Sequence, residues 1–364
     1  MVSNQILKET LNKLREASGM EFTLYRQDAT VITADYIRKS DELKVLQNHL
    51  TEEPGMQEYQ ERLYFNVFDN GNVEYVLACE KRPAYASLAG SMAVIQLEQL
   101  IESHQERQDK DNFIKNLLMD NLLPVDIYNR AKKLNINPRK PRVAFLIETR
   151  SRDNEGVLET IKSMFAENEN DFAAAIDENN IVLVKELKSA DDDQELKQIA
   201  GTIADMMNTE VMIQVRVAYG NVASEIRKVS NSYKEAKLAM SVGKIFNSDQ
   251  NIIAYASLGI GRLIYQLPLP MCKMFIEEIF KDKSPETFDE ETLTTINQFF
   301  ENSLNVSETS RQLYIHRNTL VYRLDKIQKN TGLDLRVFDD AITFKIALMV
   351  VQYMRYMEKI GRVD

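Results

Sequence analysis

Hydrophobic and polar positions alternate with different periods along the chain, and each period predicts an element. Apolar residues recur at helical spacing over residues 3–18. Two-residue alternation then predicts hairpins over 21–34 and 62–79, and Gly71 supplies the positive φ that the tight turn of the second hairpin requires. A long helix is predicted from about residue 84 to beyond residue 101. The N-terminal part therefore combines helices with antiparallel strands.

The order helix, hairpin, hairpin, long helix is common in small sensory domains of the PAS and GAF type, so residues 1–110 are predicted to form such a domain. The long helix turns strongly polar over 102–111, and an isolated polar helix is only marginally stable in water. This stretch is therefore expected to join domains or to pack against its counterpart in a homodimer, with a merely solvated linker as the alternative. Residues 111–140 are predicted to be a helical linker.

Residues 141–246 alternate between apolar strand patterns and helical patterns in the order βαββαβα. The strands are predicted at 142–148, 171–176, 181–186 and 211–218. Because buried strands need cover, this order predicts an α/β sandwich in which helices cover a mixed sheet. Residues 247–364 are predicted to form an all-helical domain. The fold class expected for the whole chain is α+β, with several domains.

Two short helices flank a tight turn at residues 314–315, and together they predict a helix-turn-helix at about 305–330. Either Asn305 or Ser307 can cap the first helix. Gly332 suits the C-terminal end of the second helix, because glycine adopts the left-handed conformation found there.

The second of these helices has one apolar face. At 100° per residue, Leu320, Leu324 and Ile327 fall on a narrow arc, which must face the core. The polar residues on the opposite side and its flank are Asn318, Thr319, Tyr322, Asp325, Lys326 and Lys329. A solvated face is the ordinary explanation of such a pattern, whereas a recognition helix would present these residues to the major groove of DNA.

The distribution of charge bears on that choice. The chain of 364 residues has 45 Lys and Arg against 55 Asp and Glu, a formal net charge of −10. This balance excludes a protein that coats nucleic acid indiscriminately, since phosphate binding needs a positive surface. Residues 305–332 nevertheless contain five cations and two anions, a local net charge of +3. A small basic module is thus embedded in an acidic chain.

Each residue type on the polar face suits a particular contact with DNA. Asn318 can make a bidentate contact to adenine, and Thr319 can use its hydroxyl or its methyl group. Tyr, Lys and Arg side chains can contact phosphates, which fix the register of the protein on the duplex. The candidate DNA-binding residues are Ser307, Arg311, His316, Arg317, Asn318, Thr319, Tyr322, Arg323, Lys326 and Lys329.

Three of the polar residues leave alternatives open or receive no contact. His316 stands where the second helix must begin, so it either caps that helix or contacts a phosphate. Arg323 lies nearer to the apolar arc and can instead brace the fold through an internal salt bridge. Asp325 faces outward but would repel phosphate, so no DNA contact is assigned to it.

The string IHRNTLVYRL at 315–324, followed by TGLDL at 331–335, resembles the C-terminal DNA-binding segment of the bacterial carbohydrate-diacid regulator family and its purine-catabolism relatives. The resemblance covers roughly residues 140–350. By this resemblance the DNA-facing segment includes His316, Arg317, Asn318, Thr319, Tyr322 and Arg323.

The resemblance also implies that the middle domain is a degenerate form of the GGDEF fold. In a diguanylate cyclase, glycines in the turn between the second and third strands let the backbone approach a nucleotide. Here that turn, residues 177–180, reads DENN. We therefore expect a non-catalytic coupling domain, and we predict no catalytic residue, metal site or cofactor for the chain.

Cys79 and Cys272 are far apart and belong to no CxxC or Cys/His cluster, so neither a disulfide scaffold nor a zinc site is expected. The N-terminus lacks the apolar core of a signal peptide. No uncharged apolar stretch approaches the ~20 residues that a membrane span needs. The protein is expected in the cytoplasm, without a membrane partner.

Together these features predict a ligand-responsive transcription regulator of a catabolic operon, which binds double-stranded operator DNA as a homodimer. The resemblance implies a small organic acid, such as a sugar diacid or glycerate, as the effector, and no residue is assigned to its binding. Two other function classes stay open. One is a sensor or interaction protein that does not bind DNA, and the other is a nucleotide-processing enzyme that acts through the middle domain.

Overall fold

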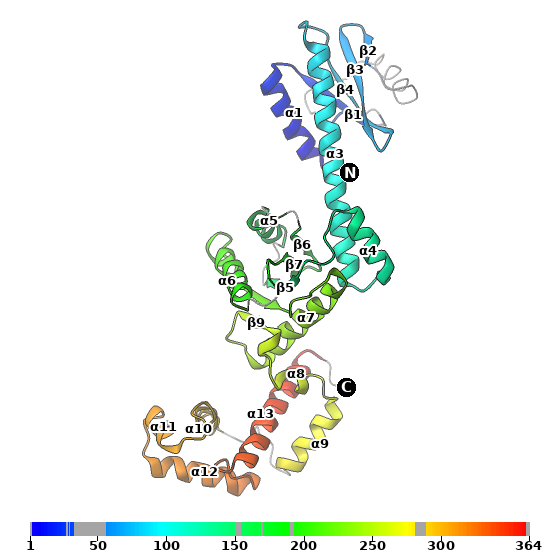
Figure 1. Cartoon of the computed structure of the whole chain (residues 1–364). Helices are drawn as coiled ribbons and strands as arrows, with labels where there is room; N and C mark the ends of the chain where they lie inside the picture. The colour runs from blue at the N-terminus through cyan, green and yellow to red at the C-terminus, as the bar shows by residue number, and fades with distance from the viewer. Residues whose placement is uncertain are drawn as a thin grey trace. The chain divides into compact units, whose positions relative to one another are not determined.

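The computed structural model describes residues 2–26, 28, 30–32, 56–149, 154–166, 168, 170–189, 193–280 and 289–361. The chain divides into two compact units, Met1–Ile114 and Lys115–Asp364, which are described separately (Figure 1). The middle and C-terminal domains predicted from the sequence both fall within the second unit. None of the helices in the described part of the chain is long and apolar enough to cross a membrane.

The first unit is a four-stranded antiparallel sheet with helices on one face. Its elements are α1 (Asn4–Ser18), β1 (Phe22–Arg26), β2 (Met56–Tyr59), β3 (Arg62–Asp69), β4 (Asn72–Glu80) and the long helix α3 (Ala86–Leu118), whose end lies in the second unit. The strand order is β1-β4-β3-β2. Alternate residues of the strands, such as Phe65 and Leu77, form one core with Leu7 and Leu11 of α1 and Leu97 of α3. The two helices therefore cover the same face of the sheet (Figure 1).

The hairpin predicted over 62–79 is confirmed, since β3 and β4 pair antiparallel, with one register shift between Val67 and Phe68, and Asn70 and Gly71 at the turn have φ angles of 47° and 82°. For the hairpin predicted over 21–34, the structure shows β1 and a bridge between Tyr25 and Val31. Residues 27, 29, 33 and 34 of that prediction lie outside the described residues. Strand β2, which pairs with β3, was not predicted.

Helix α3 lies unusually close to the sheet. A Cβ atom added to Gly90 would lie 2.3 Å from Cζ of the Phe65 ring, so only glycine allows this spacing. The side of α3 that faces the sheet is lined by Ala86, Ala93, Leu97 and Ile101, which are all buried. This inner side is distinct from the solvent side of the same helix.

The first part of the second unit contains a five-stranded sheet in the order β6-β7-β5-β8-β9. Its elements are α4 (Pro124–Lys133), β5 (Arg142–Thr149), α5 (Asn154–Met164), β6 (Phe172–Ala175), β7 (Asn180–Glu186), α6 (Asp193–Thr209), β8 (Val215–Tyr219), α7 (Val229–Phe246) and β9 (Ile252–Ala254). The predicted order βαββαβα is confirmed. Strand β9, which pairs parallel to β8 after the crossover through α7, was not predicted.

The turn between β6 and β7 is closed by its own side chains. Oδ1 of Asp177 accepts hydrogen bonds of 2.9 Å from the backbone N–H of Asn179 and from Nδ2 of Asn180. Among the residues that the structure describes, no group of three or more His, Cys, Asp or Glu side chains is placed to hold a metal ion. The turn therefore has the geometry of an ordinary hairpin connection.

The remainder of the second unit is helical. Its elements are α8 (Gly261–Ile264), α9 (Leu269–Phe280), α10 (Glu290–Glu301), α11 (Val306–Gln312), α12 (Arg317–Thr331) and α13 (Phe338–Lys359). One core joins α9, α10, α12 and α13 through residues such as Phe280, Phe299, Leu324 and Phe344. The other half of α13 packs on α7 and α8, and Nε2 of Gln352 donates a 2.5 Å hydrogen bond to the Ile245 carbonyl. The predicted helix-turn-helix thus rests on a helical scaffold.

Candidate nucleic-acid interface

Helices α11 and α12 are joined by a turn of four residues, 313–316. The turn closes through backbone hydrogen bonds from the N–H of Tyr314 to the Arg311 carbonyl (3.2 Å) and from the N–H of Ile315 to the Ser310 carbonyl (3.0 Å). Tyr314 adopts the left-handed conformation with φ of 54°, and 96% of its surface is exposed. A bulky residue such as tyrosine is uncommon in the left-handed conformation. The turn therefore presents an aromatic side chain to solvent.

The start of α11 is capped by Asn305 rather than by Ser307. Its side-chain oxygen accepts hydrogen bonds from the backbone N–H groups of Ser307 (3.0 Å) and Glu308 (3.1 Å). These bonds satisfy two of the donors that every helix start leaves open. The Ser307 side chain is left at the exposed first turn of α11.

His316 is the N-cap of α12. Its Nδ1 accepts a 3.2 Å hydrogen bond from the backbone N–H of Asn318, which confirms the capping alternative. The imidazole is exposed, so the cap does not bury it. At the other end Gly332 has φ of 83°, and its N–H donates to the Gln328 carbonyl at 2.7 Å. Both ends of the helix are thus defined by local hydrogen bonds, one from a side-chain cap and one from the backbone of Gly332.

The two faces of α12 are as the spacing predicts. Leu320 and Leu324 are fully buried and Ile327 is 1% exposed. Tyr322 on the outer side is 69% exposed. The other exposed polar residues of the helix are Arg317, Asn318, Thr319, Asp325, Lys326 and Lys329. The candidate residues on α12 other than Arg323 therefore share one accessible surface.

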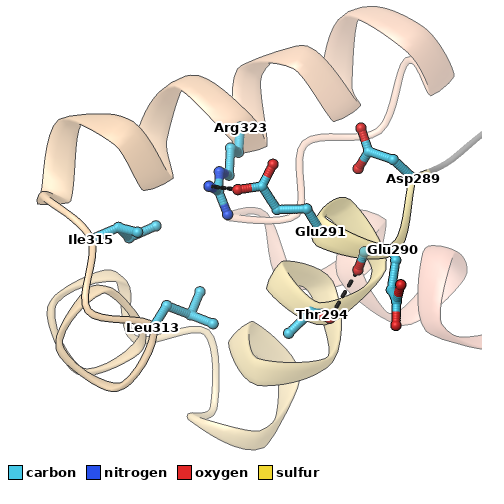
Figure 2. A pocket seen from close by; sticks show the side chains of 7 residues that line it. All are labelled: Asp289, Glu290, Glu291, Thr294, Leu313, Ile315 and Arg323. Atoms are coloured by element: carbon cyan, nitrogen blue, oxygen red, sulfur yellow. Dashed lines mark hydrogen bonds and ion pairs between the residues drawn. The ribbon is translucent and has the colours of Figure 1, made fainter.

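Arg323 is oriented differently from the other candidates. Its guanidinium pairs with the carboxylate of Glu291 on α10 and donates a 2.9 Å hydrogen bond to Oγ1 of the buried Thr295. The side chain is 19% exposed. The internal salt bridge that the sequence left open is thus present, and Arg323 positions α12 on α10 (Figure 2).

A hollow lies beside α12 on this inner flank. It has a volume of about 650 Å³ and is lined by Asp289, Glu290, Glu291, Thr294, Leu313, Ile315 and Arg323 (Figure 2). Asp289 caps α10, and hydrogen bonds from Thr292 lower the pKa of its carboxyl, so it is ionised at neutral pH. Three carboxylates would repel phosphate. The hollow is therefore not the surface that would meet DNA.

Arg311 lies on the exposed side of α11. Its guanidinium donates to Glu308 at 2.5 Å, and this hydrogen bond lowers the pKa of the Glu308 carboxyl. The Arg311 side chain is 77% exposed, and exposed ion pairs contribute little to stability. Exchange of this partner for a phosphate would therefore cost little.

Comparison with known proteins agrees with this geometry. Residues 292–350 match the model of the PucR C-terminal helix-turn-helix domain, and residues 120–242 match that of a GGDEF-like domain. The chain is 26% identical over 291 residues to the carbohydrate diacid regulator of Escherichia coli (strain K12), a match that covers 73% of this chain and 72% of that protein. The chain therefore contains a PucR-type C-terminal helix-turn-helix domain and is homologous to the CdaR and PucR regulators.

Two relatives from Bacillus subtilis (strain 168) match over less than half of the chain. The purine catabolism regulatory protein is 25% identical over 44% of this chain and 32% of its own length. The DNA-binding transcriptional activator AdeR is 27% identical over 47% of this chain and 42% of its own length. These three homologues are transcription regulators.

One exposed residue of the helix-turn-helix was absent from the candidates. Tyr314 lies in the turn between α11 and α12 and is the most exposed of the large apolar or aromatic side chains that the structure describes. The sequence signal that could have identified Tyr314 is its position, since it is an aromatic residue inside the tight turn of a helix-turn-helix. The sequence pattern could not distinguish a buried side chain from an exposed one at that point.

Proposed function

We propose that the chain is a ligand-responsive transcription regulator that binds operator DNA as a homodimer and inserts α12 into the major groove. The observation that supports this most directly is the outer surface of α12. It combines Asn318 and Thr319 near the N-terminal end with Lys326 and Lys329 farther along, all exposed. Recognition helices present their N-terminal residues to base edges and use cations to contact the backbone.

The proposed contacts follow from residue chemistry and position. Asn318 and Thr319 would read bases, because amide and hydroxyl groups match the donors and acceptors of the major groove. Arg311, Arg317, Lys326 and Lys329 would contact phosphates, together with the polar groups of Ser307, His316 and Tyr322. Arg323 would act through the position of α12 rather than through DNA, since Glu291 and Thr295 occupy its guanidinium.

For the N-terminal unit we propose a sensory role with a PAS/GAF-like domain over 1–110, followed by the helical linker 111–140. Support comes from the antiparallel sheet covered by α1 and α3 on one face. We propose that the effector is a small organic acid and that the target is a catabolic operon, by analogy with the relatives named for carbohydrate diacids and purine catabolism. The effector would shift the dimer between two arrangements for which it has different affinities.

The test is binding of the full chain to DNA from upstream of its own coding region, measured by fluorescence anisotropy against a scrambled duplex of equal length. We expect the chain to prefer the upstream DNA. We also expect its affinity to fall steeply with salt, with a slope of log affinity against log salt concentration of about −0.9 for each phosphate contacted. Equal binding of both duplexes, or a flat salt response, would instead support an interaction protein. A thermal-shift screen of the full chain with diacids, glycerate, purine metabolites and amino acids tests the effector class.

A further inference from the structure

The solvent side of α3 carries large apolar side chains that remain mostly exposed in the described part of the chain, although the hydroxyl of Tyr85 donates a 3.1 Å hydrogen bond to the Ser18 carbonyl. Tyr85, directly before the helix, is 50% exposed, and Leu88, Met92 and Ile95 are 65%, 61% and 56% exposed. We call these four residues the outer stripe. Single exposed apolar residues are ordinary on protein surfaces, but four in a row on one side of one helix are not.

The spacing of the outer stripe is that of a helix-pairing seam. Successive members are separated by three, four and three residues, which matches the a and d positions of two heptads. The residues that face the sheet occupy other positions of the same turns, so this helix has two separate apolar sides. Packing on the sheet explains the inner side, but it does not explain the outer stripe among the described residues of the first unit.

The outer stripe is also free of charge. No Asp, Glu, Lys or Arg occurs between Arg82 and Glu98, although 27% of the whole chain is charged. The exposed neighbours of the stripe are small or neutral, namely Ser87, Ser91 and Gln96. An exposed helical surface normally carries charges, because they keep the protein soluble and separate.

We propose that the outer stripe is the surface through which two copies of this chain associate, with α3 against α3. A parallel symmetric helix pair brings each residue close to the same residue of the second copy, so that any charge would meet a like charge. A neutral stripe avoids this repulsion, and small neighbours allow the helices to approach. A partner of opposite charge would select a charged surface instead. The absence of charge therefore points to a second copy as the occupant.

The direction of the pair rests on the proposed function. Paired recognition helices must reach two half-sites of one operator, and a parallel pair of α3 helices sends both chains out of the contact in the same direction. We therefore infer a parallel pair in which Leu88 lies near Leu88 of the second copy. The surface itself does not depend on DNA binding.

The first test is the mass of the full chain in solution, measured by light scattering after gel filtration. We expect a dimer of the 42.0 kDa chain. The double variant Leu88→Glu/Ile95→Glu should be monomeric and should keep its circular dichroism spectrum, since both side chains are already exposed. The matched control is Leu123→Glu/Val125→Glu, where the side chains are 70% and 71% exposed, and it should remain a dimer. A monomeric wild type, or a dimer that the first variant leaves intact, would overturn the proposal.

The second test distinguishes direction by disulfide formation with copper phenanthroline as the oxidant. The native Cys79 and Cys272 are buried and should not react. Leu88→Cys and Ile95→Cys should each give a covalent dimer if the pair is parallel and in register, whereas an antiparallel pair should link neither variant to itself. If a chain that is monomeric in solution binds operator DNA, the outer stripe is not a dimer surface, while DNA binding through α12 still stands. If the chain passes both tests but binds no DNA, the proposed function is wrong, while the outer stripe remains the dimer surface.

Discussion

The guanidinium of Arg323 on α12 pairs with the carboxylate of Glu291 on α10 and thereby connects the proposed recognition helix to its scaffold. Loss of this pair and of the bond to Thr295 should lower the free energy of unfolding by about 1–3 kcal/mol in Arg323→Ala. DNA affinity should fall with the stability of the module, while its salt dependence stays unchanged. Urea unfolding and salt titrations of binding measure the two effects.

Arg317→Ala is the matched control, because Arg317 is exposed at the start of the same helix. It should change the free energy of unfolding by less than about 0.5 kcal/mol. The slope of log affinity against log salt concentration should become shallower by about 0.9, which corresponds to the loss of one phosphate contact. The assignment of Arg323 as a positioning residue fails if Arg323→Ala reduces the salt slope and leaves stability intact.

Asn318 and Lys326 should separate sequence reading from general affinity. Asn318→Ala should reduce discrimination between the operator and its base-substituted versions by about 1–3 kcal/mol, because an amide can contact a base edge in two places. Lys326→Ala should weaken binding to all duplexes alike, since phosphates are common to every sequence. Competition binding against a panel of single-base variants measures both. Uniform weakening by Asn318→Ala would contradict a base contact at this residue.

The cap at His316 should be replaceable by another acceptor. His316→Ala removes the side chain that accepts from the Asn318 N–H and should destabilise the helix-turn-helix by about 1 kcal/mol. His316→Asn should restore most of that stability, because asparagine is among the preferred N-cap residues. Urea unfolding followed by circular dichroism tests the pair of variants. Equal stability of the alanine and asparagine variants would rule out a capping contribution.

Tyr314 is expected to contribute to DNA binding but not to the stability of the fold. Its left-handed backbone disfavours any residue with a Cβ, so Tyr314→Gly should leave the melting temperature of the chain unchanged or slightly higher. The exposed ring lies in the turn next to the start of α12, where it can reach the DNA backbone. We therefore expect weaker DNA binding in Tyr314→Gly and intermediate binding in Tyr314→Phe. Unchanged affinity in both variants would remove Tyr314 from the interface.

The Cys79 thiol should be inert in the folded protein. Burial raises its pKa to about 11, whereas a solvated thiol ionises near pH ~8.5. At pH 8.5 its alkylation by iodoacetamide should be at least about 100-fold slower than that of a free thiol, as judged by peptide mass spectrometry. The same shift means that this thiol's contribution to stability is complete below pH ~8.5 and is lost as the pH rises towards 11. Rapid labelling without denaturant would show that the site is open.

The elements of the C-terminal domain could be predicted because their signals are local. Leu320, Leu324 and Ile327 mark the buried face of α12, and Gly332 marks its end within the same helix. The strands β2 and β9 could not be predicted, since each is short and is stabilised by pairing with a strand that the pattern alone does not associate with it. Long-range pairing of this kind has no periodic signature in a short segment.

Arg323 shows the same limit within the candidate interface. Its angular position between the two faces of α12 was compatible with DNA or with the interior, and only its partner Glu291 on another helix decides between them. Helix α3 is a further case, because a separate linker was predicted to begin at residue 111, whereas α3 continues through Leu118 without a break. The polar stretch at 102–111 changes what the helix packs against, but it does not end the helix.

The close packing of α3 at Gly90 means that a substitution inside the first unit can alter its exposed surface. Any other residue there would place its Cβ against the Phe65 ring and displace the helix from the sheet. The helix would then shift the outer stripe, although position 90 itself faces away from solvent. A genetic screen for variants that no longer self-associate should therefore recover substitutions of Gly90, although this residue lies outside the proposed contact with the second copy.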